Sequence, residues 1–481
     1  MPTLAFAIWP IVTLVLFARL PLRPAIVWSL LLGYMFLPEA FAINFSGLPP
    51  IDKKSVGAIS LVAAVALYAG GTPRRRGDAA PQALVNAAPW VGTMVYVLLG
   101  MIMLNSLLTM LTNTEPVILA GRFLPAIRPW DIISATFSLI VMLIPYMLGR
   151  RFLARPEDHR LVMRALVIAG LVYSVLMLVE IRFSPQLNNW IYGYHQHSFI
   201  QHIRGGAFRP MVFMQHGLWV AFFILMGILS AFSLRRLEPR KKFGLSGVWL
   251  AIVLGLSHNL GATMLAAIFV PLVWLTPRWH ARIGAAVAIF FLLYPAARQA
   301  QLVPVDDITA FAAQISEERA SSFQFRLNNE DMLLQRALLK PISGWGQWGR
   351  NRIHNDRGED ISTTDGLWII VLGVNGWIGY IALFGLLTLP IFLMTRTGQR
   401  KDLGPETTGF VLIMAANLLY LVPNSALNPI AWLIAGALTG FVQYDAVAAR
   451  NSQVERVPVK SGARYTRFQP DHMRTTAGRA G

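Results

Sequence analysis

The feature that most constrains this fold is a series of apolar stretches, each close to the length needed to cross a lipid bilayer. A helix crosses the hydrocarbon with about 20 consecutive, mostly apolar residues. Such stretches occupy residues 3–18, 25–42, 56–71, 88–112, 132–149, 161–181, 211–233, 244–257, 259–276, 283–297, 366–394, 408–423 and 427–445. The chain is therefore predicted to be an all-α, polytopic integral membrane protein with about 12–13 transmembrane helices.

The composition agrees with a chain embedded in lipid. Of its 481 residues, 55% are hydrophobic and only 14% are charged, and the mean hydropathy is +0.51. A soluble protein of this size could not bury so much apolar surface. The first stretch has no basic segment ahead of its apolar core, so it is expected to be retained and not removed as a signal peptide. Pro10 within it, and the tight link Ser257–Asn259, leave the span count open by about one or two.

Basic residues determine the expected orientation of the spans, because Lys and Arg accumulate in cytoplasmic loops. If the stretches alternate in direction, all the basic clusters fall on one side, which is predicted to be cytoplasmic. The clusters are Arg19/Arg23, Arg74–Arg76, Arg150/Arg151/Arg155, Arg235/Arg236 with Arg240–Lys242, Arg278/Arg282, Arg396/Arg400/Lys401 and the tail from Arg450. Loops 43–55, 113–131, 182–210 and 298–365 are then predicted to lie on the outer face.

This reading divides the chain into regions. Residues 1–297 and 366–445 are predicted to be membrane-spanning, 298–365 to be a large outer loop with short helices, and 446–481 to be a disordered, basic cytoplasmic tail. The net charge of +18 comes mostly from the cytoplasmic clusters and the tail, so no nucleic-acid partner is expected. The absence of Cys excludes disulfides, thiolate metal sites and cysteine nucleophiles.

The outer loop 298–365 concentrates charge in an otherwise apolar chain. It holds ten of the 24 acidic residues, together with seven arginines and one lysine. A helix is predicted to start at an N-cap, Asn328 or Asn329, and to stop at Pro341. Its apolar pair Leu334/Leu338 is expected to pack against the membrane domain.

Several polar and aromatic side chains of this loop have two open interpretations. Arg326 either binds a ligand or pairs with Glu330, which is four residues further on. Trp345 and Trp348 lie in a glycine-rich turn and either stack on sugar rings or anchor the loop at the lipid headgroups. Asp365 either takes part in chemistry or only caps the helix that follows it.

The order of motifs resembles the O-antigen ligase and polysaccharide polymerase superfamily (Wzy/WaaL-like proteins). The matching residues are Arg326, Ala337-Leu338, Pro341, Gly344-x-Gly346, Asp365-Gly366 and Gly376-Trp377-Ile378-Gly379, with a second patch at Arg204–Pro210. The layout of many spans with one large, late outer loop is also similar.

The resemblance implies transfer of a glycan from an undecaprenyl-pyrophosphate carrier to an acceptor hydroxyl on a glycan or lipid, at the periplasmic face of a bacterial inner membrane. It implies no cofactor, no metal and possible contact with other polysaccharide assembly proteins. A leaving pyrophosphate favours arginines over lysines. The predicted catalytic residues are Asp365, Arg326 and His354, and the predicted substrate-binding residues are Arg204, Arg209, Arg336, Arg350, Trp345 and Trp348.

The sequence departs from the family at two positions. Family members commonly carry a His-Asn pair where this chain has Asp365-Gly366, so Asp365 or His354 is expected to act as the general base. A Ser-Arg pair is expected near Ser257, where the chain reads Ser257-His258-Asn259. Two alternative functions therefore stay open: a transporter or flippase of a lipid-linked glycan, and a non-catalytic subunit of a polysaccharide export assembly.

A histidine-rich segment in the loop 182–210 suggests a metal site at first sight. His195, His197 and His202 do not have the spacing of a standard site, and no acidic residue lies nearby. The sequence therefore predicts no metal ion.

Overall fold

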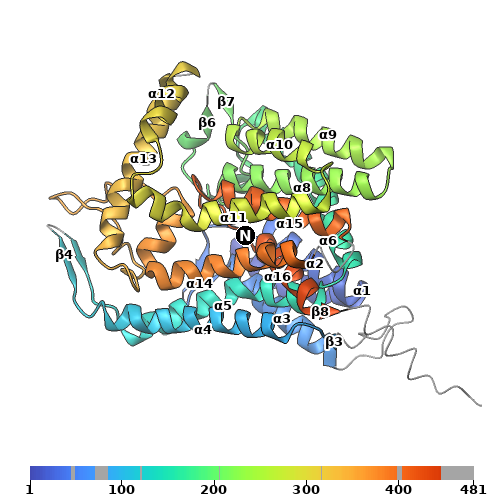
Figure 1. Cartoon of the computed structure of the whole chain (residues 1–481), viewed down its shortest axis with the longest axis horizontal. Helices are drawn as coiled ribbons and strands as arrows, with labels where there is room; N and C mark the ends of the chain where they lie inside the picture. Colours follow the sequence, from blue (N-terminus) through green and yellow to red (C-terminus); the bar gives the residue numbers. More distant parts are fainter. Residues whose placement is uncertain are drawn as a thin grey trace, which may run out of the picture.

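The structure, a computed structural model, is mostly helical, and most of its helices run along the longest axis of the molecule (Figure 1). It describes residues 1–44, 49–70, 85–119, 122–204, 206–315, 317–397 and 403–445. The helices that match predicted stretches are α1 (Pro2–Arg19), α2 (Leu22–Phe36), α3 (Lys53–Gly70), α4 (Pro89–Leu111), α5 (Pro129–Phe152), α6 (Pro156–Phe183), α8 (Gly217–Leu237), α9 (Lys241–Leu256), α10 (Leu260–Leu272), α11 (Pro277–Gln299), α14 (Leu367–Thr397), α15 (Pro405–Tyr420) and α16 (Pro429–Gln443).

The remaining elements are short or lie outside the predicted spans. The additional helices are α7 (Leu187–Tyr192), α12 (Val305–Ile315), α13 (Glu317–Leu338) and the 3-10 turn η1 (Ile200–His202). The strands form antiparallel pairs: β1 (Ala42–Ile43) with β2 (Ile51–Asp52), β3 (Val85–Asn86) with β8 (Tyr444–Asp445), β4 (Val117–Leu119) with β5 (Arg122–Leu124), and β6 (Ile203–Arg204) with β7 (Ala207–Phe208).

The prediction of an all-α, polytopic membrane protein is confirmed. Among the described residues, seven helices are long and apolar enough to cross a membrane: α1, α4, α5, α6, α8, α11 and α14. The shorter apolar helices are α2, α10, α15 and α16. The predicted 12–13 transmembrane helices included short helices as full membrane spans. The 13 residues of α10, for example, rise only about 20 Å, against a hydrocarbon thickness of about 30 Å.

The tight link Ser257–Asn259 is the tip of a hairpin between α9 and α10. His258 takes a positive φ of 51°, and Asn259 caps α10 by accepting a hydrogen bond from the Ala262 N–H at 3.2 Å. Arg236, in the last turn of α8, donates to the carbonyl of Val273 just after α10, at 2.6 Å. The hairpin therefore returns to the end of α8, and its tip lies at the other end, where α8 begins.

Predicted cytoplasmic residues gather at one end of the bundle and form ion pairs between helices there. Arg23 lies 3.0 Å from Asp158, which joins the starts of α2 and α6. Arg160 of α6 lies 4.0 Å from Glu238, after α8, and 3.8 Å from Glu406, at the start of α15. Several basic clusters thus share one end, as the alternating topology requires.

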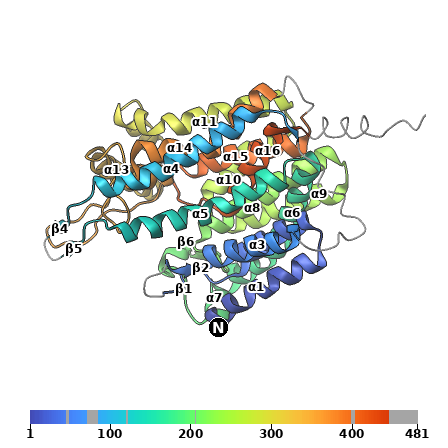
Figure 2. The same ribbon diagram turned by 90° about the horizontal axis from the view of Figure 1, so that it is seen from below.

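The segments predicted as outer loops meet at the opposite end. Figures 1 and 2 show α12, α13 and the β4–β5 hairpin projecting from that end of the bundle. Lys53, at the start of α3, donates to the Phe213 carbonyl of the 184–216 segment at 3.1 Å. The cluster Arg74–Arg76 and the tail 446–481 lie outside the described residues.

The helix in the large loop differs from its prediction. α13 already begins at Glu317, so Asn328 and Asn329 lie inside it and not at an N-cap. Asn329 instead uses its side chain for tertiary contacts, accepting from the Thr363 N–H at 2.9 Å. The cap preference of Asn is only local, and packing of α13 outweighs it. Leu334 is buried against the membrane domain, as predicted.

Candidate functional site

Arg326 and Asp365, two of the predicted catalytic residues, form an ion pair. The Arg326 Nε lies 3.3 Å from the Asp365 Oδ2, and the two side chains are 33% and 32% exposed. Arg326 also donates through Nη1 to the carbonyl of Pro423 at 3.4 Å. α14 begins at Leu367, so Asp365 lies one residue before the N-cap position. About one third of each side chain is exposed, so the pair is accessible to a ligand.

Glu330, one turn after Arg326 on α13, is buried beside this pair. It accepts a hydrogen bond from the Trp368 Nε1 at 3.3 Å. Burial raises the pKa of its carboxyl to about 7; Arg298 opposes the rise, while Asp331 and Asp365 add to it. Glu330 thus lies close to Asp365 but is not the ion-pair partner of Arg326. The sequence alone did not indicate this burial.

Arg209 approaches the same region from the segment that precedes α8. Its Nη2 donates to the His258 carbonyl at the α9–α10 tip, at 3.3 Å. A Cβ on Gly217 would lie 2.5 Å from the Arg209 Cγ, so glycine is needed where the arginine stem crosses the start of α8. The chain therefore places this guanidinium over the beginning of α8.

His216, the N-cap residue of α8, lies within electrostatic range of both arginines. Its Nδ1 accepts from the Leu218 N–H at 3.0 Å. Burial, the neighbouring His202 and His197, and then the charges of Arg209 and Arg326 lower the pKa of His216 to about 2. His216 is therefore a neutral imidazole close to both guanidinium groups. It lay within a predicted span, 211–233, whose first residues are not helical in the structure.

A chain of hydrogen bonds holds the surroundings in place. Asn259 donates to the Tyr420 hydroxyl at 3.4 Å, and that hydroxyl donates to the Leu218 carbonyl at 2.9 Å. The α9–α10 tip, the end of α15 and the start of α8 are thereby fixed together. We call the residues Arg209, His216, Arg326, Glu330 and Asp365 the outer-face cluster, after the face on which the sequence predicts these segments to lie.

The other predicted site residues whose side chains are described contact different parts of the chain. Arg204 belongs to β6, but its side chain is not among the described residues. His354 pairs with Asp360 in an isolated antiparallel bridge of the 353–361 hairpin. Arg352, just before that hairpin, forms an ion pair with Asp360 at 2.5 Å.

Arg350 is fully buried on backbone carbonyls. Its Nη1 donates to Pro125 at 2.7 Å and its Nη2 to Glu115 at 2.8 Å, and the residue is 2% exposed. Both acceptors belong to the 113–128 segment around β4 and β5. Arg350 therefore links the large loop to the 113–128 segment. To bind pyrophosphate, Arg350 would have to give up these hydrogen bonds.

Arg336 and Trp345 are stacked on each other. The guanidinium carbon of Arg336 lies 3.6 Å from the centroid of the Trp345 ring, and the Trp345 Nε1 donates to the Arg336 carbonyl at 2.7 Å. Lys340 lies 5.0 Å from the same ring. Cations thus cover a face of Trp345 that a sugar would need for stacking. Trp348 is 59% exposed and lines a cavity of about 90 Å³ between α4 and α5.

The glycine motifs of the large loop and of α14 interlock. At Gly376, α14 is broken by a φ of 61° and a ψ of −168°. The backbone of the loop fills the break: the Trp377 N–H donates to the Pro341 carbonyl at 2.7 Å, and the Gly346 N–H donates to the Val374 carbonyl at 2.9 Å. A Cβ on Gly344 would lie 2.4 Å from the Val374 carbonyl oxygen. The close approach that these glycines allow is between two protein segments.

An apolar cavity of about 390 Å³ lies beside the outer-face cluster, between the outer end of α11 and the helices α12 and α13. Leu327 and Phe323 of α13 line it on one side, and Tyr294 lines it on the other. The Tyr294 ring lies 5.1 Å from that of Trp368, the hydrogen-bond donor to Glu330. An apolar space and a charged cluster are thus neighbours.

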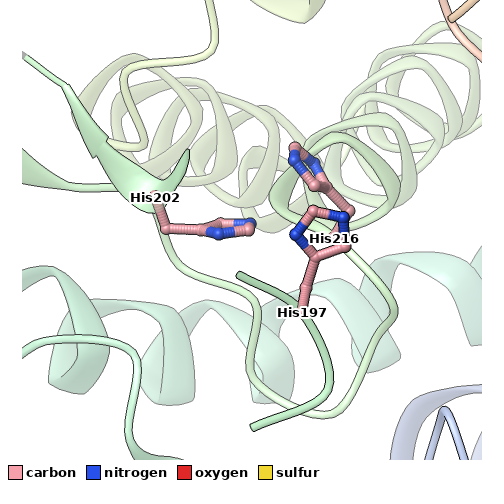
Figure 3. Close-up of side chains that lie close together, drawn as sticks. All are labelled: His197, His202 and His216. Atoms are coloured by element: carbon pink, nitrogen blue, oxygen red, sulfur yellow. The ribbon is translucent and has the colours of Figure 1, made fainter. Parts of the chain in front are cut away.

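The segment before α8 brings three histidines together, as Figure 3 shows. They are His197, His202 and His216, whose candidate ligand atoms all lie within 4.8 Å of one another. Glu180 of α6 anchors this segment by accepting from the Met211 and Val212 N–H groups at 2.8 and 2.7 Å. The sequence analysis missed the cluster because His216 lay inside a predicted span.

The architecture defines a polytopic, all-α membrane protein. Comparisons with known protein families, with curated proteins and with solved structures find no match for this chain.

Proposed function

We propose that this protein is a membrane glycosyltransferase of bacterial surface polysaccharide assembly. It would act like an O-antigen ligase or a polysaccharide polymerase, at the periplasmic face of the inner membrane. The donor would be a glycan on undecaprenyl pyrophosphate and the acceptor a hydroxyl of a glycan or lipid. The resemblance in motif order supplies this reaction class, and the positive-inside rule supplies the side.

The observation that supports the proposal most is the Arg326–Asp365 ion pair. The order of motifs predicted both residues for the site, and two separate elements bring them to 3.3 Å from each other. Arg209 lies in the same region. Its positive charge and the positive charge of Arg326 both contribute to lowering the pKa of His216. Two arginines and one carboxylate are a suitable set for a diphosphate leaving group and a base.

The chemistry follows from this arrangement. A donor diphosphate would compete with Asp365 for Arg326 and leave the carboxylate free. The acceptor oxygen then attacks the anomeric carbon while the bond from that carbon to the phosphate oxygen breaks. The hydroxyl proton passes to Asp365, and the pyrophosphate leaves on the carrier lipid. Fixed guanidinium charge at the developing diphosphate is the main source of rate enhancement.

The apolar cavity supports a lipid-linked donor. Its lining residues Phe323 and Leu327 lie on α13 on either side of Arg326 in sequence. A polyprenyl chain in this cavity would have its diphosphate near the outer-face cluster. Burial of apolar chain segments would add affinity that does not depend on the glycan.

The transporter alternative has one feature in its favour, the broken helix α14, because transporters commonly bind substrates at interrupted spans. Here, however, the loop 341–346 already satisfies the backbone at the break, through bonds such as Trp377 N–H to Pro341. The enzyme is therefore the better-supported function.

The test is surface glycan production in a deletion strain that carries plasmid copies of the gene. Arg326→Ala and Asp365→Asn should each abolish or strongly reduce the polymer, with normal amounts of protein in the membrane. The matched control is Arg352→Ala, which removes an ion pair of similar exposure in the same loop. Normal glycan with both site variants would refute the assignment, as would equal loss with the control.

A transport role is separated by a reconstituted assay. Purified protein in vesicles is given a lipid-linked glycan and an acceptor on the same side of the membrane. Formation of a new glycosidic bond supports the enzyme. Movement of the donor between leaflets without bond formation supports the transporter.

A further inference from the structure

Three imidazoles that are separate in sequence surround one point at the edge of the outer-face cluster, to which one of them, His216, belongs. The ring centroids of His197, His202 and His216 are separated by 5.4, 4.8 and 4.4 Å, and their candidate ligand atoms lie within 4.8 Å of one another. Figure 3 shows the rings turned toward each other. Two come from the segment before β6 and β7, and the third begins α8.

The tautomer of His202 is suited to metal binding. Its Nδ1 contacts the Ser198 carbonyl at 2.9 Å, and because a carbonyl only accepts, Nδ1 carries the proton. The Nε2 lone pair is then directed inward, where the Gly217 N–H lies at a long 3.4 Å. A backbone carbonyl on the outer nitrogen is the usual support of a metal-binding histidine.

His197 contributes an unsatisfied nitrogen. Its Nδ1 is buried and has no hydrogen-bond partner within the described part of the chain. A buried polar atom without a partner is costly and calls for a ligand such as a water or an ion. The position of this atom inside a group of imidazoles points to a cation that accepts nitrogen ligands.

The surroundings set how strongly such a cation can bind. His216 would have to exchange its cap bond to the Leu218 N–H for a bond to the metal. Arg209 and Arg326 place positive charge near His216, and Asp365 offsets that of Arg326 only in part. The loss of the cap bond and the nearby positive charge both lower the affinity of the site for a cation, so metal binding should be reversible.

We propose that His197, His202 and His216 form a reversible binding site for zinc, with the fourth position open to water or an anion. Zinc commonly takes three histidines and one open position, with Zn–N distances of about 2.0–2.1 Å. Nitrogens in such a tetrahedron are about 3.3 Å apart. The candidate ligand atoms, which lie within 4.8 Å of one another, would therefore approach by up to about 1.5 Å on binding zinc. The site does not rest on the proposed function, because metal binding is measured directly.

The test uses the full-length protein in lipid nanodiscs, purified with a tag that contains no histidine and stripped with a chelator. Titration with Zn²⁺ should show one equivalent bound per chain. Co²⁺ in its place should give the visible absorption of a tetrahedral nitrogen site. Zn²⁺ should also raise the Tm, because it links the segment before β6 to α8.

The variants are His197→Gln, His202→Gln and His216→Asn, the last of which keeps a good helix cap. Each should lose the bound equivalent and the zinc-dependent rise in Tm. The control is His195→Gln, an exposed histidine outside the cluster, which should bind as the wild type does. Arg209→Gln should bind zinc several-fold more tightly, because it removes a nearby positive charge.

Two results would overturn the proposal: no binding by the wild type, or binding that the three cluster variants leave unchanged. Each variant is first checked for its Tm without metal. A variant that does not fold is replaced by the corresponding Ala or Phe substitution, and binding by that folded variant decides the question.

Discussion

Arg326 of α13 and Asp365, just before α14, are joined by a direct ion pair of 3.3 Å at the end of the bundle where the outer segments meet. About one third of each side chain is exposed. An exposed pair of this kind contributes little to stability, roughly 0–1 kcal/mol. The pair is therefore better explained by what it can bind than by what it stabilises.

A charge exchange separates these two explanations. In the double variant Arg326→Asp with Asp365→Arg the attraction is kept, so the Tm should stay within a few degrees of the wild type. Glycan transfer should fall by roughly 10²-fold or more, because the cation and the base have changed places. Thermal unfolding and the reconstituted transfer assay measure the two effects. Transfer at the wild-type rate would show that the pair is only structural.

Glu330 should make stability depend on pH. Burial raises its pKa from 4.5 to about 7, so the folded protein keeps this proton at pH values where the unfolded chain has lost it. The contribution of the protonated Glu330 carboxyl to the free energy of unfolding has its full value below pH 4.5 and is lost as the pH rises to about 7. The loss is on the order of 3 kcal/mol.

Glu330→Gln tests this dependence, because a glutamine carbonyl can still accept from Trp368. The difference in Tm between the variant and the wild type should be small near pH 4.5 and should grow in favour of the variant up to pH 7. Thermal unfolding across this range measures it. Parallel profiles for the two proteins would contradict the raised pKa.

The glycine at the break of α14 should be important for the stability of the fold. At Gly376 the φ is 61°, and a Cβ would lie 2.4 Å from the Ile342 carbonyl oxygen. Gly376→Ala should therefore destabilise the protein by at least about 2 kcal/mol, through backbone strain and the clash. The control is Gly100→Ala in α4, where a Cβ meets nothing within 4 Å and little change is expected. Equal Tm values for the two variants would contradict the interlocked arrangement.

The fold was largely predictable because apolar length is a strong local signal. Every predicted stretch overlaps a helix. Motif order predicted Arg326 and Asp365 as site residues, but it did not predict the ion pair between them. The broken helix was not predictable, since the conformation of Gly376 depends on Pro341 and its neighbours filling the gap. Contacts between distant segments leave no local pattern.

The roles of individual side chains were harder to predict for the same reason. The sequence indicated Glu330 only as a candidate ion-pair partner of Arg326, and its burial depends on Trp368 from another helix. The sequence allowed Trp345 to stack on a sugar ring. In the structure, the guanidinium carbon of Arg336 lies 3.6 Å from the centroid of the Trp345 ring. His216 lay in a stretch assigned to the membrane, so its histidine neighbours could not be recognised.

Arg350 offers the sharpest contrast with Arg326, because the sequence predicted Arg326 as a catalytic residue and Arg350 as a substrate-binding residue of the same site. Arg350 is buried and donates to the carbonyls of Pro125 and Glu115, so Arg350→Met leaves buried acceptors without donors. The variant should lose about 2–4 kcal/mol of stability. The protein that remains folded should transfer glycan at nearly the wild-type rate, whereas Arg326→Ala should show the reverse pattern. Thermal unfolding combined with transfer per folded molecule measures both. If Arg350→Met lost glycan transfer at unchanged stability, Arg350 would be assigned to substrate binding. A residue with only a structural role cannot reduce the rate without weakening the fold.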